Sequence, residues 1–576
     1  MAASSEFRAF LDRDWKQWLE ESPEVATAVG YPGLNDRWND DSPVGVAARR
    51  AHLAGCLVKL DRFERDRLSE EERLNYDMYR ELVVTAEEGV RFGADPYPFH
   101  FGMPHNLWMP LTQLDGIQQS PTHISDYQPL SNRKEYEDLL ARFAAYPRVV
   151  DVTLDLLAVG LDRGYSPPRV TLPGLPDQIT AQIPSDPAES PVLKPFREFP
   201  PAVAEADRTD LARRAASIYA EGIVPSLTKL RAYLAKSYIP KCRSTIAASD
   251  LPNGSEYYAY LVRWQTTTDL TPQQVHDIGM GEVRRLRSEM EKLIRSTGFS
   301  GSFAEFCQYL RTDPKFYFDS AEELLDAYRV IAKKVDPALG RLFGRLPRAQ
   351  YGVLPVPEFA APTSPSAYYI SGASTTGRPG YFYANTYKID VRPKWEMEAL
   401  TLHEAVPGHH LQISVAQEID GLPDFRRETG PTAFIEGWGL YAESLGEELG
   451  LFKDPYSKFG QLTYDMWRSI RLVVDTGMHA LGWTRDRSIQ FFRENTGKSD
   501  QDIVVEVDRY IVWPGQALAY KIGQLKFREL RTLAEQKLGD KFDVRAFHGV
   551  ALGQGAVSLR QLAAQVHRWI DAKLSN

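Results

Sequence analysis

Apolar residues recur at spacings of three and four, between charged residues, over most of the chain. This period places the apolar side chains on one face of a helix, so it predicts long amphipathic helices. An amphipathic helix is also predicted within Met1–Gly30. The clearest internal segments are Lys134–Leu161, Asp207–Ser237, Thr271–Ser296 and Ala321–Arg345. The predicted fold class is therefore mostly α.

Two segments break the helical pattern. Pro167–Phe199 is rich in proline, which is typical of a long surface connection. Tyr351–Asp390 is rich in Pro, Gly, Ser and Tyr, and its part Gly380–Tyr387 has residues typical of a strand. Because proline is favoured in the first turn of a helix, Pro393 predicts a helix directly afterwards. We therefore expect a strand and then a helix over Tyr381–His403, with a small β-sheet next to that helix.

Composition and charge narrow the classes of function. The chain has 68 Lys and Arg against 77 Asp and Glu, a net charge of −9, and the two signs are mixed along the sequence. A nucleic-acid partner is therefore not expected. No run of 18 uncharged apolar residues occurs, and the N-terminal segment lacks the apolar centre of a secretory signal, so we predict a cytoplasmic protein with no membrane partner.

The three cysteines, Cys56, Cys242 and Cys307, form no C-x-x-C pair. A thiolate zinc site is therefore not predicted, and any metal must be bound by histidine and carboxylate. Phosphate-binding glycine loops and the G-x-S-x-G elbow of serine hydrolases are also absent from the sequence.

The densest chemical signal is the segment L-H-E-A-V-P-G-H-H-L-Q at 402–412. A His-Glu pair in an apolar helix is typical of the H-E-x-x-H zinc motif, in which two histidines one turn apart bind the metal and the glutamate is the general base. The residue four positions after His403 is Pro407, so that motif is absent in its simple form. Pro407 cannot donate to the carbonyl of His403, and Gly408 tolerates unusual dihedral angles, so we predict a local bulge that absorbs two residues.

Such a bulge returns His409 to the position of the second ligand. His403 and His409 are therefore the predicted metal ligands, with Glu404 as general base. His410 is the alternative second ligand, or a group that supports one.

A third ligand is expected from the proline-started helix that begins near residue 431. Glu436 and Glu443 lie seven residues apart on one face of it, and two histidines with one glutamate are a common catalytic zinc set. Glu436 is the predicted ligand. Glu443 is either an alternative ligand or the group that orients a ligating histidine through its ring N–H.

Four motifs in this order resemble those of the domain of unknown function 885 family, and the resemblance spans most of the chain. They are H-E-A-V-P-G-H-H-L-Q at 403–412, F-I-E-G-W-G-L-Y-A-E at 434–443, R-L-V-V-D-T-G-M-H-A-L-G-W at 471–483 and R-Y-I-V-W-P-G-Q-A-L-A-Y-K at 509–521. The family in turn is similar to the gluzincin zinc metallopeptidases, in particular the neurolysin-like and carboxypeptidase-Taq-like enzymes.

The resemblance implies a large helical zincin-like body that encloses a deep cleft over one zinc ion per chain. It matches His403 and His409 to the paired ligands, Glu404 to the general base and Glu436 to the downstream glutamate. Residues 1–250 are then expected to form one wall of the cleft, and residues 251–576 to carry the metal site. The implied activity is zinc-dependent hydrolysis of a peptide or of an amide-containing small molecule.

Zinc-dependent hydrolysis also needs a hydrogen-bond donor for the oxyanion that develops on the substrate. Arg471, Asp475 and His479 are spaced by four residues and share a helix face. His479 is therefore a candidate catalytic group, although a buried structural ion pair is an equal alternative.

A second set of candidates gathers around the Trp513–Gly515 turn. Tyr520 is the predicted oxyanion donor, Tyr510 is a candidate for the same site, and Arg509 or Lys521 is predicted to bind a substrate carboxylate. A further expectation is that the predicted strand is an edge strand that pairs with an extended substrate. Its candidate residues are Tyr383 and Asn385, although its tyrosines are equally typical of ordinary half-buried strand positions.

Two other functions are alternatives. The same ligands could bind Fe(II) in a lyase or oxygenase, although such an enzyme needs no base like Glu404. A non-catalytic helical binding protein would be expected to lose Glu404 or a ligand. The sequence predicts neither the substrate's identity nor the oligomeric state.

Overall fold

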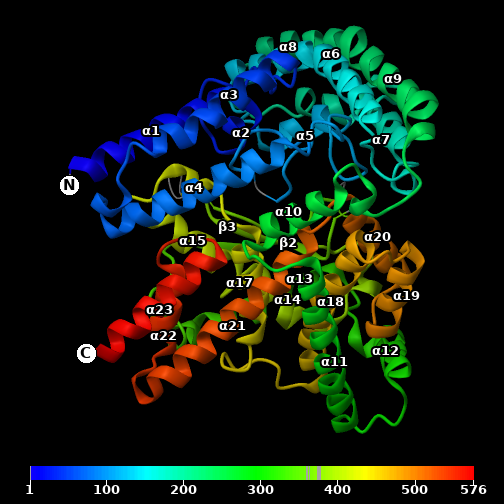
Figure 1. Ribbon diagram of the computed structural model, residues 1–576. Helices are drawn as coiled ribbons and strands as arrows, with labels where there is room; N and C mark the ends of the chain where they lie inside the picture. The colour runs from blue at the N-terminus through cyan, green and yellow to red at the C-terminus, as the bar shows by residue number, and fades with distance from the viewer. Residues whose placement is uncertain (1, 101, 359–360, 362–363, 373–377, 576) are drawn as a thin grey trace. The chain divides into compact units, whose positions relative to one another are not determined.

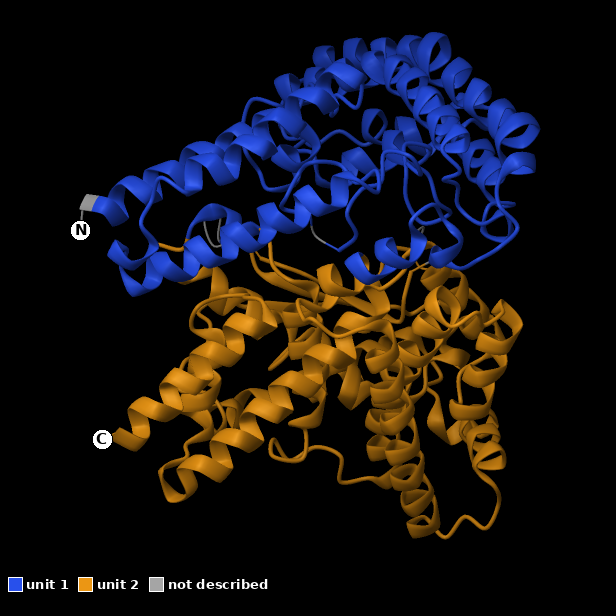
Figure 2. Ribbon diagram, in the orientation of Figure 1, with its two compact units in different colours: residues 1–260, 423–428 blue, residues 261–422, 429–576 orange. Residues whose placement is uncertain are grey.

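The computed structural model describes residues 2–100, 102–358, 361, 364–372 and 378–575. The structure is 67% helical with one small sheet, which confirms the mostly α class. The chain forms two compact units, shown in Figure 2. Unit 1 comprises residues 1–260 and 423–428, and unit 2 comprises residues 261–422 and 429–576.

Unit 1 is built from helices, labelled in Figure 1. They are α1 (Ala2–Glu21), α2 (Pro23–Ala28), α3 (Pro43–Leu60), α4 (Glu70–Val90), α5 (Ser120–Tyr127), α6 (Arg133–Asp162), α7 (Leu175–Gln182), α8 (Glu205–Ile218), α9 (Val224–Tyr233), α16 (Asp424–Glu428) and most of α10 (Gly254–Thr266). The predicted helix at 134–161 is confirmed as α6. The helix predicted over 207–237 is present as α8 and α9, joined by a wider helical turn.

The core of unit 1 is built around α6. Tyr136, Phe143, Val150 and Leu157 recur every seven residues on one face of this helix, and all four are buried. The N-terminus of α6 is fixed by Asn132, whose side chain accepts a hydrogen bond from the backbone N–H of Glu135.

Unit 2 contains the remaining helices and the sheet. Its helices are α11 (Pro272–Ser296), α12 (Phe303–Thr312), α13 (Ala321–Val335), α14 (Met397–Glu404), α15 (His409–Gln417), α17 (Thr432–Ser444), α18 (Pro455–Ala480), α19 (Arg485–Asn495), α20 (Asp500–Val512), α21 (Ala519–Leu538), α22 (Val544–Leu552) and α23 (Leu559–Ser575); its strands are β1 (Tyr351–Pro355), β2 (Ala367–Ile370) and β3 (Gly380–Ala384). The prediction for 271–296 is confirmed. The helix predicted over 321–345 ends earlier, because a 3-10 turn at Asp336–Arg341 follows α13.

The strand order in the sheet is β1-β3-β2, with β1 parallel and β2 antiparallel to β3. Phe382 and Ala384 on β3 are fully buried and alternate with half-buried tyrosines. The predicted strand and helix are confirmed as β3 and α14, with a 3-10 turn at Lys394–Glu396 between them. However, β3 is the central strand and not an edge, because β1 and β2 occupy its two sides.

Helix α14 contacts α13, α17, α18 and β2, so it lies at the centre of unit 2. Helix α17 packs closely on α21 at a crossing of two glycines. A Cβ atom on Gly437 would lie 2.4 Å from the Cα of Gly523, which leaves no room for a side chain. This close approach brings the first turn of α21 next to the middle of α17.

Candidate metal centre

Between α14 and α15 the chain turns at residues 405–408. Pro407 lacks the N–H that would continue the helix, and a Cβ atom on Gly408 would lie 1.9 Å from the carbonyl oxygen of His403. The predicted bulge is therefore corrected to a complete break between two helices. The break brings the ring of His409 to 4.7 Å from that of His403, between centroids, with the ring planes nearly perpendicular.

Both histidines face one carboxylate oxygen. The Nε2 atoms of His403 and His409 lie 3.5 and 3.6 Å from the same Oε2 atom of Glu436, which α17 carries. Two ligands that bind one tetrahedral ion with bonds of 2.0–2.1 Å lie about 3.4 Å apart. The structure thus brings the three predicted ligands together at separations suited to one shared ion.

The charges of this cluster also suit a cation. Burial alone lowers the pKa of His403, but the carboxylates of Glu436 and Glu443 beside its ring raise that pKa to about 9. Burial opposes ionisation of Glu436, but the two histidine rings that face its carboxylate hold its pKa well below the usual range. The two carboxylates therefore favour positive charge at this place, and two histidines with one glutamate are a donor set that suits a divalent ion.

Glu443 supports His403 from the other side of the ring. Its Oε1 atom lies 2.8 Å from the Nδ1 atom of His403, and its side chain is fully buried. This leaves the Nε2 atom of His403 facing Glu436, so Glu443 orients the imidazole and lies outside the ligand cluster. Sequence reasoning missed Gly439, where a Cβ atom would lie 2.8–3.1 Å from three atoms of the His403 ring. The G-W-G pattern at 437–439 was the available signal for it.

Two further predicted groups lie close to the cluster. Glu404 is the last residue of α14, directly after His403, and is 8% exposed. Tyr520 is in the first turn of α21; burial, and next the negative charge of Glu436, raise the pKa of its hydroxyl. The guanidinium carbon of Arg471 lies 4.7 Å from the centroid of the Tyr520 ring.

His410 faces away from these groups. Its Nδ1 atom lies 2.8 Å from the Tyr369 hydroxyl on β2 and 3.3 Å from the Ser414 hydroxyl, and burial lowers its pKa to about 4. The structure therefore places His409 in the ligand cluster and His410 in the packing between α15 and the sheet.

His479 is fully buried, and its Nε2 atom lies 2.9 Å from the carbonyl oxygen of Tyr510. This contact places His479 at the end of α20, as the alternative of a buried structural role predicts. The Tyr510 hydroxyl is also engaged, because it donates to Glu506 and accepts from the Nε atom of Arg471. Arg509 pairs with Glu506 and donates to the Oε1 atom of Gln516 at 2.7 Å.

Lys521 is already engaged in ion pairs. Its ammonium group is fully buried and forms ion pairs with Asp465 on α18 and Glu282 on α11, the latter at 2.8 Å. Because both partners lie far from it in sequence, the spacing around the Pro-Gly turn could not reveal this pairing. The predicted role of Lys521 is corrected to that of a buried link between three helices.

The predicted substrate strand is also corrected. Hydrogen bonds to β1 and β2 already occupy both edges of β3, so Tyr383 has no free backbone for a substrate; its ring stacks on that of Tyr368. The Asn385 side chain is buried and donates hydrogen bonds to the carbonyls of Ala361, Ser364 and Pro365. Asn385 therefore fixes the loop that follows β1.

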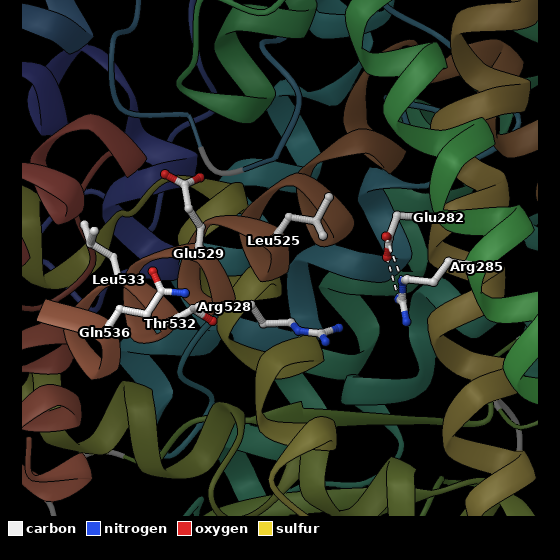
Figure 3. A pocket seen from close by; sticks show the side chains of 8 residues that line it. All are labelled: Glu282, Arg285, Leu525, Arg528, Glu529, Thr532, Leu533 and Gln536. Atoms are coloured by element: carbon white, nitrogen blue, oxygen red, sulfur yellow. Dashed lines mark hydrogen bonds and ion pairs between the residues drawn. The ribbon is translucent and has the colours of Figure 1, made fainter. Parts of the chain in front are cut away.

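A pocket of about 530 Å³ lies on the surface of unit 2, between α11 and α21 (Figure 3). Its walls combine carboxylates, guanidinium groups and leucines, and Glu282 and Arg285 form an ion pair at one side. The lining residues are Glu282, Arg285, Leu525, Arg528, Glu529, Thr532, Leu533 and Gln536. None of them belongs to the predicted site, so this pocket is not the candidate substrate site.

A second cluster of possible ligand atoms, from Asp14, His52 and Cys56, lies in unit 1. Asp14 accepts hydrogen bonds from Trp18 and Tyr79, and the two His52 ring nitrogens lie 3.0 and 3.1 Å from Glu21 and Asp14 carboxylates. These groups already satisfy one another, so the cluster is a buried ion-pair network.

The comparisons with known proteins agree with the fold. A protein from Colwellia psychrerythraea, provisionally assigned as a lipoprotein, superimposes with a TM-score of 0.92 at 27% identity, over 99% of this chain and 100% of that one. A protein of unknown function from Shewanella oneidensis, with the same provisional assignment, gives a TM-score of 0.72 at 16% identity, over 97% and 99%. A metallocarboxypeptidase from Trypanosoma cruzi gives only 0.34 at 12% identity, over 99% and 100%, which is too distant to support a conclusion.

No curated protein matches the chain. The family model described as bacterial protein of unknown function, DUF885, matches residues 23–566. This match covers nearly the whole chain and includes all four motifs at 403–521. The protein therefore belongs to the domain of unknown function 885 family.

Proposed function

We propose that the protein is a zinc-dependent metallohydrolase that cleaves a peptide or amide bond. The observation that carries this proposal is the convergence of His403, His409 and Glu436 beside the buried carboxylate of Glu404. Two histidines and one glutamate hold catalytic zinc in other hydrolases and leave a fourth position open. A zinc ion held by these residues would polarise the substrate carbonyl and lower the pKa of water.

Each nearby side chain then has a role in the reaction. Glu404 accepts the proton of the attacking water and passes it to the leaving nitrogen. Tyr520 keeps its hydroxyl proton, because burial and the charge of Glu436 raise its pKa, and donates a hydrogen bond to the carbonyl oxygen as that oxygen becomes negative.

Arg509 is proposed to attract a carboxylate of the substrate. Arg471 and Arg509 share Glu506 as an ion-pair partner, so the pair of guanidinium groups carries one more charge than that carboxylate neutralises. A substrate with a free carboxylate would meet this surplus near Tyr520, whose ring lies 4.7 Å from the guanidinium carbon of Arg471 and whose hydroxyl pKa is raised by burial and by the charge of Glu436.

The first test is the metal content of the purified protein. We expect one zinc ion per chain in the wild type, its loss in His409→Ala and in Glu436→Ala, and its retention in the control His567→Ala, which changes an exposed histidine on α23. A wild-type protein that stays metal-free after zinc addition would contradict the proposal, as would one that binds iron and not zinc.

Activity is tested by mass spectrometry of a peptide mixture and of N-acyl amino acids. Cleavage should disappear after treatment with a chelator and return with zinc. Zinc-loaded wild type that cleaves neither class of substrate would contradict the hydrolase part of the proposal and leave the metal site standing.

The location in the cell is a separate prediction. Among the described residues, no helix is long and apolar enough to cross a bilayer. The sequence predicts the cytoplasm, while the Colwellia and Shewanella proteins are provisionally assigned as lipoproteins. Fractionation of cells that express the native gene distinguishes the two: recovery with membranes would contradict the cytoplasmic prediction.

A further inference from the structure

Behind the candidate metal centre, α18 places a guanidinium group against the carboxylate that supports His403. We infer that Arg468 is a positioning residue, which holds Glu443 and, through it, His403 in the geometry that binds the metal. This inference rests on the proposed zinc site and adds a residue that is not one of the proposed metal ligands.

Glu443 needs a cation because it is fully buried. The Nη2 atom of Arg468 lies 3.6 Å from its Oε1 atom, the same oxygen that lies 2.8 Å from the Nδ1 atom of His403. In the part of the chain that the structure describes, these two residues are the only ion-pair partners of Glu443. A histidine that binds a metal is neutral, so in the loaded protein Arg468 is the side chain that remains as the ion-pair partner of Glu443 among the described residues.

Two atoms at this contact still lack a partner. The Oε2 atom of Glu443 and the Nε atom of Arg468 are both buried and have no hydrogen bond among the described residues. One is an acceptor and the other a donor, and a guanidinium group can bind a carboxylate through Nε and Nη2 at the same time. A bidentate pair between the two side chains would therefore satisfy both atoms.

The place of Arg468 is fixed independently of Glu443. Its Nη1 atom donates a hydrogen bond to the carbonyl of Tyr464 at 3.3 Å, and its guanidinium group lies 4.7 Å from the Tyr464 ring. The same group lies 6.0 Å from the ring of Tyr520. Arg468 is thus held on α18 between the carboxylate that orients His403 and the proposed oxyanion donor.

The test is zinc affinity, measured by competition with a chromophoric chelator. Loss of a group that orients a ligating histidine typically weakens metal binding about 10–100-fold, and we expect this of Glu443→Gln. Arg468→Met should weaken binding about 5–20-fold, within or just below the range for such partners. Arg468→Lys should recover part of the loss, since a lysine keeps the charge but not the bidentate geometry.

The double variant Arg468→Met/Glu443→Gln distinguishes positioning from general packing. If Arg468 acts through Glu443, the double variant binds zinc no more weakly than Glu443→Gln alone. The visible spectrum of the cobalt-substituted protein should also change in the same way in both single variants. The matched control is Arg531→Met, which removes a half-buried arginine of the same unit that pairs with Glu448; its zinc affinity should equal that of the wild type.

Additive losses of zinc affinity in the double variant would overturn the inference. An Arg468→Met variant with the zinc affinity and the cobalt spectrum of the wild type would also overturn it. If Arg468→Met does not fold, the comparison uses Arg468→Lys, alone and combined with Glu443→Gln, with the same criterion of additivity. Failure of the wild type to bind zinc would overturn the proposed function itself. Binding by the wild type with unchanged binding in both Arg468 variants would overturn this inference alone.

Discussion

A single carboxylate oxygen, Oε2 of Glu436, receives two histidine nitrogens at nearly equal distances of 3.5 and 3.6 Å. These distances exceed those of ordinary charged hydrogen bonds, so the three side chains do not satisfy one another as a close-packed structural triad would. In unit 1, by contrast, His52 lies 3.0 and 3.1 Å from its two carboxylates. At the scale of single residues, this difference separates a candidate metal site from a structural ion-pair network.

Glu404→Gln should separate metal binding from chemistry. The amide cannot accept a proton from water, so we expect the turnover number kcat to fall about 10²–10⁴-fold, as for loss of a general base. Zinc content should not change, because Glu404 is not one of the three converging ligands. Elemental analysis and steady-state kinetics on the same preparation measure both quantities; loss of zinc would instead make Glu404 a ligand.

Gly439→Ala should weaken zinc binding although the residue has no ligand atom. The added Cβ would lie 2.8 and 2.9 Å from the Cε1 and Nε2 atoms of His403, so the ring has to move away from Glu436. The control is Gly549→Ala on α22, where a Cβ atom meets nothing within 4 Å. Zinc titration of both variants tests the prediction, and equal affinity would show that the ring has room to adjust.

At the scale of elements, the crossing of α17 and α21 determines which side chains reach the centre. Glu436 precedes one glycine of the crossing by one residue, and Tyr520 precedes the other by three. The contact between Gly437 and Gly523 therefore fixes the distance between the proposed ligand and the proposed oxyanion donor.

Gly523→Ala should both destabilise the protein and lower its activity. The new Cβ would lie 1.9 Å from the carbonyl oxygen of Ala433, so α21 has to shift outward and carry Tyr520 with it. Overpacking of this kind costs about 1–3 kcal/mol of unfolding free energy. Urea unfolding and kcat measure the two effects. A loss of stability with unchanged kcat would argue against Tyr520 as the oxyanion donor.

Much of this arrangement could be predicted from local sequence signals. The helical period gave the limits of α6 and α11, since each has a regular apolar face and a capping residue, Asn132 or Thr271, at its start. The proline and glycine at 407–408 indicated an irregular backbone near His403, although the result is a break and not a bulge. These features depend on residues that are neighbours in the sequence, so a local sequence pattern can predict them.

The rest depends on partners that are distant in sequence. Lys521 could be taken for a substrate-binding group because its partners Glu282 and Asp465 are on other helices. The central place of β3 follows from β1 and β2, which the sequence did not indicate as strands. No sequence pattern indicated a role for Arg468, because only the packing of α18 against α17 brings it to Glu443.

At the scale of the whole chain, all of the predicted metal, catalytic and substrate residues lie in unit 2. Unit 1 has its own buried polar centre around His52, which stacks on Trp18 at 4.0 Å between ring centroids. Burial alone lowers the pKa of His52, but hydrogen bonds, first to Asp14, raise it to about 11 from an ordinary 6.5. His52 is therefore a buried cation between the carboxylates of Asp14 and Glu21, and its effect on stability should depend on pH.

The sign of this dependence follows from the raised pKa. Below pH 6.5 the imidazole is protonated in both the folded and the unfolded chain, so the whole stabilisation is present; it is lost as the pH rises toward 11, because only the folded chain then holds the proton. His52→Gln should lower the unfolding free energy by about 3–5 kcal/mol at pH 6, since it removes the imidazolium between the buried carboxylate of Asp14 and the partly exposed carboxylate of Glu21. The difference between variant and wild type should shrink at pH 9.

Urea unfolding at pH 6 and pH 9 measures this difference, with His567→Gln as the exposed control. A difference that stays constant from pH 6 to pH 9 would mean that the network does not hold His52 protonated, and its contribution would then be packing against Trp18 alone.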